Sequence, residues 1–207
     1  WDGTTGGTIF FRVAGELVNN GSITTTGLGY RGGDGQENYQ YYAQGWRGES
    51  IFGVMEGSCH NGQFGYNDMR TGNNTGAGAG GHGGHWWGQS GGGGAGYGTN
   101  GIDGWNTNGD LYGTTYGTTE LTRLYLGGGG GSGGVNSSYS EESRRKGGNG
   151  GGIISIFASS ITQNNSISSD GNEGESYYNS NNPGGGGGSG GSVWLVSASF
   201  TNNNNIT

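Results

Sequence analysis

The sequence predicts an all-β fold: a short parallel β-helix-like stack of three coils that carries a large glycine-rich excursion. Three observations predict it. A seventeen-residue segment occurs three times, glycine is very abundant, and apolar residues are scarce. Repeats of this kind bury their apolar faces by stacking on their neighbours. The copies are 8–24, 152–168 and 191–207, the excursion is 25–151, and we expect 1–207 to be one domain.

The three copies align over their whole length without a gap. Their sequences are TIFFRVAGELVNNGSIT, GIISIFASSITQNNSIS and GSVWLVSASFTNNNNIT. The columns that stand out are Leu17, Ile161 and Phe200; Asn20, Asn164 and Asn203; Ile23, Ile167 and Ile206; and the apolar column Val13, Phe157 and Val196. The alternative is a chance similarity in a sequence biased towards threonine, asparagine and glycine.

The first copy has the pattern of two short strands joined by turns. Residues 9–13 are β-branched or aromatic except for one arginine, Asn19-Asn20-Gly21 supplies a turn, and Ile23 begins another strand. Stacked copies would place equivalent side chains about 4.8 Å apart, and asparagine amides can then bond along the stack. Hairpins in an ordinary β-sandwich are the alternative. The stack is favoured because gapless copies are separated by insertions of very different length.

The composition limits how such a chain can hold itself together. Glycine contributes 56 of 207 residues, far above the usual share of about 7 %, and the absence of a Gly-X-Y period excludes collagen. Hydrophobic residues make up 28 % and charged residues 11 %, so neither a large aliphatic core nor typical disorder is expected. We therefore expect backbone hydrogen bonds and stacked aromatic or asparagine side chains to dominate.

The glycine runs 127–134, 147–152 and 184–191 allow two interpretations. They are either flexible linkers or extended polyproline-II-like segments that hydrogen-bond to one another side by side. The last two runs directly precede predicted strands, which favours ordered packing, and several such segments together would satisfy their own N–H and C=O groups. In the excursion, residues 118–126 are a plausible strand and residues 50–55 a degenerate fourth copy.

The turn Asn19-Asn20-Gly21-Ser22-Ile23, and the run 184–191 followed by an apolar strand, carry a resemblance to known proteins. They resemble glycine-rich extracellular proteins of bacteria and phages, including phage tail-tip adhesins whose glycine runs pack as polyglycine-II helices. The resemblance covers the repeat copies and the glycine runs. It implies an extracellular structural or adhesive role and brings no catalytic residue with it.

Charge and hydropathy exclude several classes of partner. The net charge is −7, with 8 lysines and arginines in total, which argues against nucleic acid and anionic membranes. No apolar run approaches the ~18 residues of a membrane span, so we expect no membrane insertion.

The sequence starts at Trp1 without a signal-peptide pattern, which fits a processed product or an excised segment. Cys59 is the only cysteine, so no intrachain disulfide forms.

Neither a metal site nor a catalytic site has a distinctive motif. His82 and His85 have the only metal-like spacing, with Cys59 and His60 as further candidates, but no third ligand lies beside them in the sequence. A glycan-cleaving enzyme needs paired carboxylates. The candidates, none of them in a local motif, are Asp34, Glu37, Glu49, Glu56, Asp103 and Asp110. We therefore expect no enzyme activity, no cofactor and no metal, and we assign Asp2 and Asp170 to Asx-type turns.

Two further groups of residues could have a function. Most tyrosines and tryptophans fall in predicted loops, where they can bind sugars or proteins or supply the core that aliphatic residues do not. Sequons for glycosylation occur at Asn20, Asn73, Asn136, Asn164 and Asn205. They are acceptors only in a host that glycosylates surface proteins, and at Asn20 and Asn164 a glycan would compete with stacking.

The sequence predicts a structural subunit of an extracellular filament that polymerises with itself. Thr207 ends the third copy, and Trp1-Asp2-Gly3 supplies the continuation that Ser169-Asp170-Gly171 supplies after the second. The expected interface residues are Trp1, Ile9, Phe11, Val13, Leu17, Asn20, Ile23, Trp194, Val196, Phe200, Asn203 and Ile206. The continuation could equally mean that the chain is one period of a longer repetitive protein. The alternative functions are a non-polymerising adhesin that binds a cell-surface glycan or receptor, and a polysaccharide-active enzyme.

Overall fold

The computed structural model describes residues 1–34, 48–51, 95–102, 113, 115–118, 120–133, 146–176 and 184–207. Every regular element in these residues is a β-strand, and none is a helix. The strands are β1 (Thr8–Arg12), β2 (Glu16–Asn19), β3 (Ile23–Thr24), β4 (Ile153–Phe157), β5 (Ser160–Gln163), β6 (Ile167–Ser168), β7 (Ser192–Val196) and β8 (Ser199–Asn202). All of them lie in the three repeat copies.

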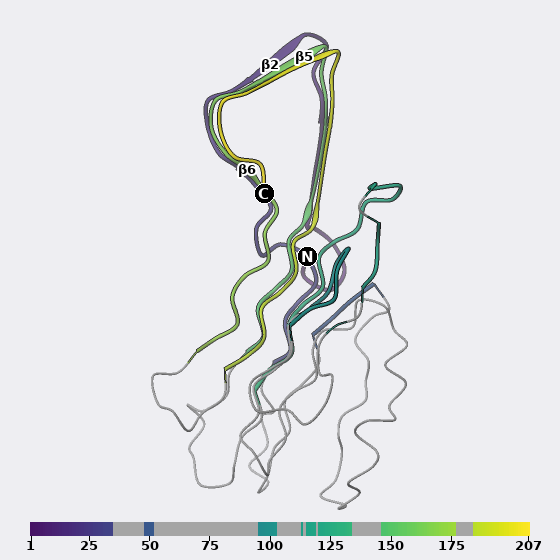
Figure 1. The fold of residues 1–207 in the computed structure, drawn as a ribbon, viewed down its shortest axis with the longest axis vertical. Coiled ribbons are helices and arrows are strands. Elements are labelled where there is room, and N and C mark those ends of the chain that lie inside the picture. The colour runs from purple at the N-terminus through teal and green to yellow at the C-terminus, as the bar shows by residue number, and fades with distance from the viewer. Residues whose placement is uncertain are drawn as a thin grey trace, which may run out of the picture.

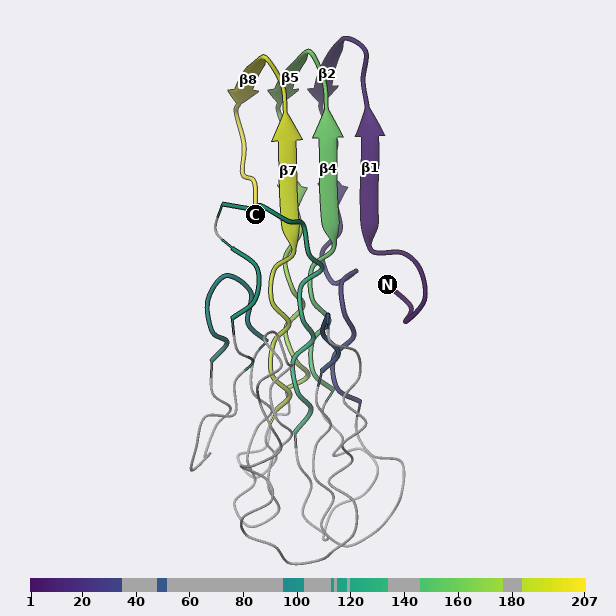
Figure 2. The same ribbon diagram turned by 90° about the vertical axis from the view of Figure 1, so that its right-hand side faces the viewer.

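Each copy contributes one strand to each of two three-stranded sheets, and copies 1 and 2 also form a third, two-stranded sheet. The sheets are β1-β4-β7, β2-β5-β8 and β3-β6, all parallel, and Ile206 of the third copy bridges to Ile167. Figure 1 shows the copies with nearly superimposed outlines, and Figure 2 shows their strands side by side in the order copy 1, copy 2, copy 3. The predictions of an all-β fold and of parallel stacking are therefore confirmed.

The gapless alignment is wrong over the first strand. Phe157 pairs with Arg12 rather than with Val13, so Val13 does not belong to the predicted column. The pairing of Phe157 with Val196 in that column is confirmed. Copy 1 has three residues between its first two strands where copies 2 and 3 have two. The extra residue fits because the corner has open space around it: a Cβ atom at Gly15 would meet nothing within 4 Å. From Glu16 onward the predicted register holds.

This shift of one residue decides which side chains face inwards, since a slip of one position turns every side chain to the other face of a strand. Ile9 and Phe11 pair with Ile154 and Ile156 and pack against the core, whereas Phe10 is 67 % exposed. In the gapless alignment Phe10 would have stacked on Ile154. The alternation of exposure along β1 is that of a strand with one buried face.

The core lies inside the outline of the stack and is centred on copy 2. Its fully buried residues are four isoleucines at 0–1 % exposure, namely Ile154, Ile156, Ile161 and Ile167. Apolar residues of copies 1 and 3 cover them from both sides. Burying an isoleucine stabilises a fold by about 1.5–3 kcal/mol, so the middle copy supplies the fully buried part of the hydrophobic core of the stack.

Polar side chains also align along the stack. Asn203 donates to Asn164 at 2.8 Å, and Asn164 donates to Asn20 at 2.9 Å. A second, buried contact runs beside this column, where Asn19 donates to Gln163 at 2.9 Å. The predicted ladder of asparagine amides is therefore confirmed, and it connects all three copies.

Below the stack, five extended segments run side by side and hydrogen-bond through their backbones (Figures 1 and 2). We name them segments A to E in chain order: 27–34, 127–133, 146–152, 169–175 and 184–191. None of them has a strand assignment. The prediction that the glycine runs pack in an ordered way is confirmed for the described residues.

The hydrogen bonds of segment C repeat every three residues. Gly147 and Gly150 donate to segment A, Gly148 and Gly151 donate to segment E, and Asn149 accepts from segment D, all at 2.7–2.9 Å. Three residues per turn is the period of the polyproline-II helix. A segment of this kind directs its backbone groups to three sides, so its neighbours can surround it.

Glycine is required because these backbones are very close. A Cβ atom at Gly130, Gly147 or Gly151 would lie well inside 3.0 Å of a neighbouring carbonyl oxygen, a distance that real Cβ atoms essentially never reach. The obstacle at each position is backbone, which cannot turn aside as a side chain can. The high glycine content of segments A to E is thus explained by packing between them.

One predicted strand is absent. None of the described residues of 118–126 has a strand assignment. The N–H of Leu121 donates to Thr118 and closes a turn, and Leu121 has a φ of 48°. Most of the predicted fourth copy at 50–55 lies outside the described residues, as do Cys59, His60, His82 and His85.

Candidate subunit interface

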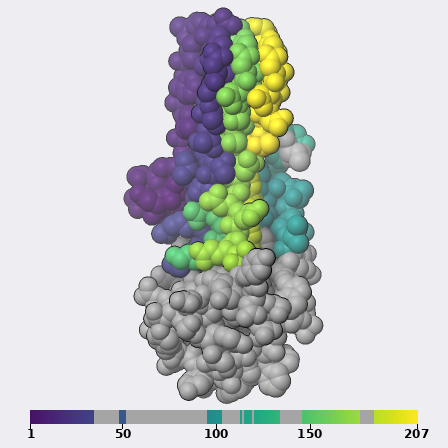
Figure 3. All heavy atoms as spheres, turned by 90° about the vertical axis from the view of Figure 1, so that its left-hand side faces the viewer, coloured from purple at the N-terminus to yellow at the C-terminus, as the bar shows by residue number. Residues whose placement is uncertain are grey.

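The stack has two edges. The copy-1 edge consists of β1, β2 and β3, and the copy-3 edge consists of β7, β8 and Ile206. Within the residues that the structure describes, neither edge has a strand neighbour on its outer side. Figure 3 shows copy 1 (purple) and copy 3 (yellow) on opposite sides of the narrow upper part of the molecule. Each edge therefore presents a row of backbone groups that a further strand could pair with.

The hydrogen bonds of β1 show which backbone groups are involved. Ile153 donates to Gly7 at 2.7 Å, and Val13 donates to Phe157 at 2.8 Å. Both bonds use odd-numbered residues of copy 1. Since successive residues of a strand direct their amides to opposite sides, the even-numbered residues of β1 direct theirs away from copy 2.

The copy-3 edge has the complementary arrangement. Ser192 donates to Gly152, and Ala158 donates to Val196, both at 3.0 Å. The even-numbered residues of β7 thus bond to copy 2, and the odd-numbered residues face outwards. Within the stack, Thr8 and Ser192 both pair with Ile153. If a second molecule continued this register, its Thr8 would pair with Ser192. The outward N–H and C=O groups of β7 would then lie opposite the outward C=O and N–H groups of the second molecule's β1.

The side chains at the edges are only partly buried. Leu17, Ile161 and Phe200 form one inward column, in which Ile161 is 1 % exposed and Phe200 is 45 % exposed. Ile23 and Ile206 occupy the corresponding places beside Ile167. Each edge leaves half-covered core side chains where the middle copy has fully buried ones.

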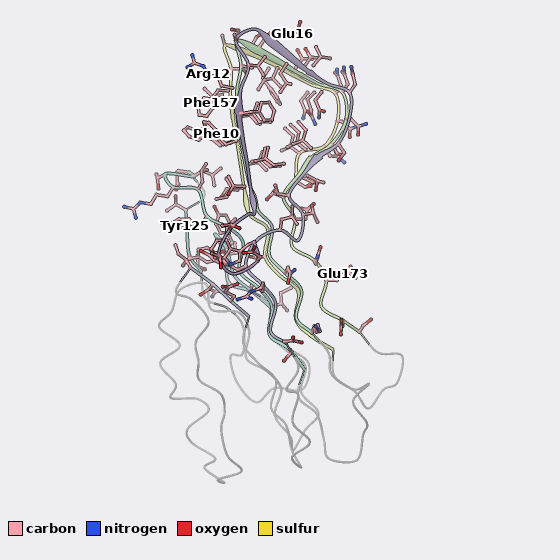
Figure 4. All side chains as sticks on the ribbon, turned by 180° about the vertical axis from the view of Figure 1, so that it is seen from behind. Phe10, Arg12, Glu16, Tyr125, Phe157 and Glu173 are labelled. Carbon is pink, nitrogen blue, oxygen red and sulfur yellow. The ribbon has the colours of Figure 1, made fainter. Side chains whose placement is uncertain are left out.

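The outer face of the first sheet carries a separate aromatic group. Phe157 contacts Phe10 with ring centroids 5.7 Å apart and Trp194 with centroids 5.3 Å apart. Figure 4 shows Phe10, Phe157 and Arg12 projecting from the outside of the stack. Trp194 and Val196 are exposed on this face, so these two predicted interface residues lie beside the inward columns and not in them.

A buried carboxylate lies near the chain's first residues. The Glu49 carboxylate accepts hydrogen bonds from Trp1 Nε1, from the backbone N–H of Arg31 and from Arg31 Nε, each at 3.1 Å. Trp1 also packs edge-on against Tyr30. Trp1 is therefore held within its own chain, through a contact with Glu49 that the sequence analysis did not predict.

The protonation of Glu49 should couple stability to pH. Burial raises its pKa, but hydrogen bonds from Arg31 and Trp1 outweigh burial and hold the pKa of this carboxyl below its usual value. A lowered folded-state pKa contributes stability that is present above the unfolded-state pKa and is lost as pH falls through the folded one. We expect Glu49→Gln to lower the thermal midpoint at neutral pH and to flatten its fall in acid. An unchanged midpoint at neutral pH would contradict this assignment.

A tyrosine cluster lies beside the first residue of β7. Ser192 Oγ contacts Tyr97 OH at 2.6 Å, accepts from the backbone N–H of Tyr125 at 3.0 Å and donates to the Tyr125 carbonyl at 2.9 Å. Tyr116 packs edge-on against both tyrosines, and burial raises its pKa. In this part of the chain the aromatic residues supply core, which is one of the two roles that the sequence allowed.

The remaining predicted residues are placed as follows. Asp2 accepts from the backbone N–H groups of Thr4 and Thr5 at 2.8 Å, which confirms its turn, whereas Asp170 accepts from the Thr207 hydroxyl. Asn20, Asn164 and Asn205 are exposed, and the other two sequons lie outside the described residues. The sequence pointed to Glu49 only as one of several candidate carboxylates, and no pattern pointed to Ser192. The partners of both residues are distant in the chain.

Comparison with known protein families, with curated proteins and with solved structures gave no match. The described residues contain no helix long and apolar enough to cross a membrane. They also contain no group of three or more histidine, cysteine or acidic side chains that could hold a metal ion. The geometry of the edges is therefore the main observation that bears on function.

Proposed function

We propose that this chain is a structural subunit of an extracellular filament, in which the copy-3 edge of one molecule stacks on the copy-1 edge of the next. The contact is heterologous, because different surfaces meet, and a head-to-tail contact that does not close gives a fibre. Pairing of strand edges supplies main-chain hydrogen bonds. The extracellular location in this proposal follows from the resemblance of the turns and glycine runs to bacterial and phage surface proteins.

The observation that carries the proposal is the match between the two edges. Their outward N–H and C=O groups alternate in the way needed to continue the hydrogen bonds found between the copies. Their partly exposed apolar side chains would also cover each other. The asparagine column also continues, because Asn203 Oδ1 and Asn20 Nδ2 have no partner among the described residues. An amide of one copy could therefore donate to the amide of the next.

The finer architecture belongs to the same proposal. The copies act as coils of a short β-helix, and segments A to E act as a polyglycine-II lattice that fixes the coils at their base. The three-residue period of hydrogen bonds in segment C supports the lattice. A stack extended by further molecules would lengthen both parts together.

A non-polymerising adhesin is the second candidate, and the aromatic group on the outer face favours it. Phe10 and Trp194 are 67 % and 45 % exposed, and exposed aromatic rings can stack on sugars or pack against a protein receptor. A glycan array probed with the monomeric chain would distinguish this role, because an adhesin binds without forming fibres.

A proline at the copy-1 edge tests the filament. The Phe10 N–H faces outwards, so Phe10→Pro removes a donor that no other described residue of the molecule uses, and edge strands tolerate proline for this reason. We expect negative-stain electron microscopy to show fibres for the unmodified chain and monomers for Phe10→Pro. Phe10→Ala, which keeps the N–H group, is the matched control and should still form fibres. Fibres of Phe10→Pro, or none from the unmodified chain, would refute the proposal.

A further inference from the structure

Three Asn-Gly pairs lie in the described residues: Asn20-Gly21, Asn100-Gly101 and Asn149-Gly150. In such a pair the backbone nitrogen of glycine can attack the asparagine side chain, because glycine has no Cβ to obstruct the approach. The reaction needs that nitrogen to be free of other hydrogen bonds. It also needs a side chain that can swing onto it.

Two of the pairs are held in place. The N–H of Gly150 donates to Tyr30 and the N–H of Gly101 donates to Gly113, each at 2.9 Å. Their side chains are held as well: Asn149 bonds to two backbone groups of segment A, and Asn100 Oδ1 accepts from both the N–H and the hydroxyl of Thr115.

The pair in copy 1 is different. The N–H of Gly21 reaches only the Asn19 side chain, at 3.3 Å, and no backbone acceptor among the described residues. Asn20 is exposed, its Oδ1 accepts one bond from Asn164, and its Nδ2 has no acceptor in the described part of the chain. A Cβ atom at Gly21 would meet nothing within 4 Å, so the turn has open space around it.

We propose that Asn20 is a site of spontaneous deamidation that limits assembly. The Gly21 nitrogen bonds to Asn20 Cγ while the Cγ–Nδ2 bond breaks, and ammonia leaves with the proton of the Gly21 N–H. Water then opens the succinimide at either carbonyl, which gives aspartate or isoaspartate. The reaction consumes one water molecule and needs no oxidant or reductant.

The consequence for assembly rests on the proposed function. Asn20 lies at the copy-1 edge, where its Nδ2 would donate to Asn203 Oδ1 of the preceding molecule. A carboxylate in its place is acceptor-only, so two acceptors would face each other, and isoaspartate would also lengthen the backbone of the turn. Once stacked, Asn20 would be covered and protected. The equivalent residues Asn164 and Asn203 precede asparagines rather than glycine and should react slowly.

The experiment is to incubate the full-length purified chain in mildly alkaline buffer and to follow each asparagine by peptide mass spectrometry. We expect the mass gain of an NH₂-to-OH exchange to appear at Asn20 several-fold faster than at Asn100 or Asn149. Gly21→Ala, which fits the open space, should slow the change several-fold at Asn20 alone. Equal rates at the three sites, or no effect of Gly21→Ala, would overturn the assignment.

Sedimentation separates this inference from the proposed function. If fibres form, the soluble fraction should become enriched in deamidated Asn20, and Asn20→Asp should assemble less than the unmodified chain. An even distribution between pellet and supernatant would overturn the link to assembly. If no fibres form, the proposed function fails, while the difference in rate between the three sites is still measured.

Discussion

Gly188→Ala is expected to destabilise the molecule severely, whereas Gly187→Ala, one residue earlier in the same segment, is expected to be neutral or stabilising. A Cβ atom at Gly188 would lie well inside 3.0 Å of the backbone carbonyl of Asn149. The Cβ atom of an alanine at 187 would have its nearest neighbour, the Asn172 oxygen, at 3.7 Å, which is ordinary contact.

The size of the effect follows from what must move. Overpacking costs about 1–3 kcal/mol and occasionally more. Because the obstacle at 188 is a backbone that is itself bonded to further segments, we expect a loss of about 3 kcal/mol or more. Gly187→Ala reduces only the freedom of the unfolded chain, which stabilises by about 0.4–1 kcal/mol where the backbone is compatible.

Denaturant unfolding of both variants checks this prediction. The midpoint for Gly188→Ala should fall sharply, or the variant should fail to fold, while Gly187→Ala should match or exceed the unmodified chain. Gly191→Ala and Gly190→Ala form a second pair, since only Gly191 faces a neighbouring backbone at close range. Equal effects within either pair would mean that the segments do not pack as the structure shows.

The repeat copies could be predicted from sequence because their signal is local. Columns such as Asn20, Asn164 and Asn203 stand out in the alignment and do stack. The register of the first strand was missed because Phe10 and Phe11 are both aromatic, so composition does not show which one faces inwards. The structure shows that Phe11 packs against the core and that Phe10 is exposed. The extra residue that shifts the strand lies in the corner around Gly15, where there is open space.

The remaining contacts depend on packing between distant segments. Glycine runs carry no side-chain pattern, so the sequence could indicate order but not which segments are neighbours. Glu49 and Ser192 bond to groups that lie 18 or more residues away, and nothing beside them in the sequence marks these partners. The stack was predicted better than the segments below it, since its residues belong to the repeats.

Ile161→Ala is expected to destabilise the isolated molecule strongly, and Phe200→Ala to weaken assembly instead. Both residues belong to one inward column, but Ile161 is 1 % exposed and Phe200 is 45 % exposed. Truncating a fully buried isoleucine to alanine costs about 2–5 kcal/mol. Phe200 loses less in the isolated molecule, because almost half of its surface is already in contact with water.

In a fibre the same phenylalanine would be covered by Leu17 of the next molecule. Full burial of such a side chain is worth about 1.5–3 kcal/mol, so the part still exposed corresponds to about 1 kcal/mol. Since 1.4 kcal/mol is a factor of ten in an equilibrium constant, Phe200→Ala should raise the lowest concentration that gives fibres about fivefold. Phe200→Asp should abolish fibres, because the junction would bury an unpaired charge.

Thermal unfolding of dilute protein and pelleting over a concentration series measure the two quantities separately. Ile102→Ala is the control, since Ile102 is 83 % exposed and lies outside the repeat copies, and it should change neither. The two substitutions can be compared directly because Ile161 and Phe200 belong to the same column. Ile161→Ala removes contacts within the molecule, whereas Phe200→Ala mainly removes a contact that only a second molecule can make. Phe200→Ala could instead destabilise the isolated molecule as much as Ile161→Ala and leave fibre formation unchanged. The copy-3 edge would then not be an interface, and the proposed head-to-tail contact would be wrong.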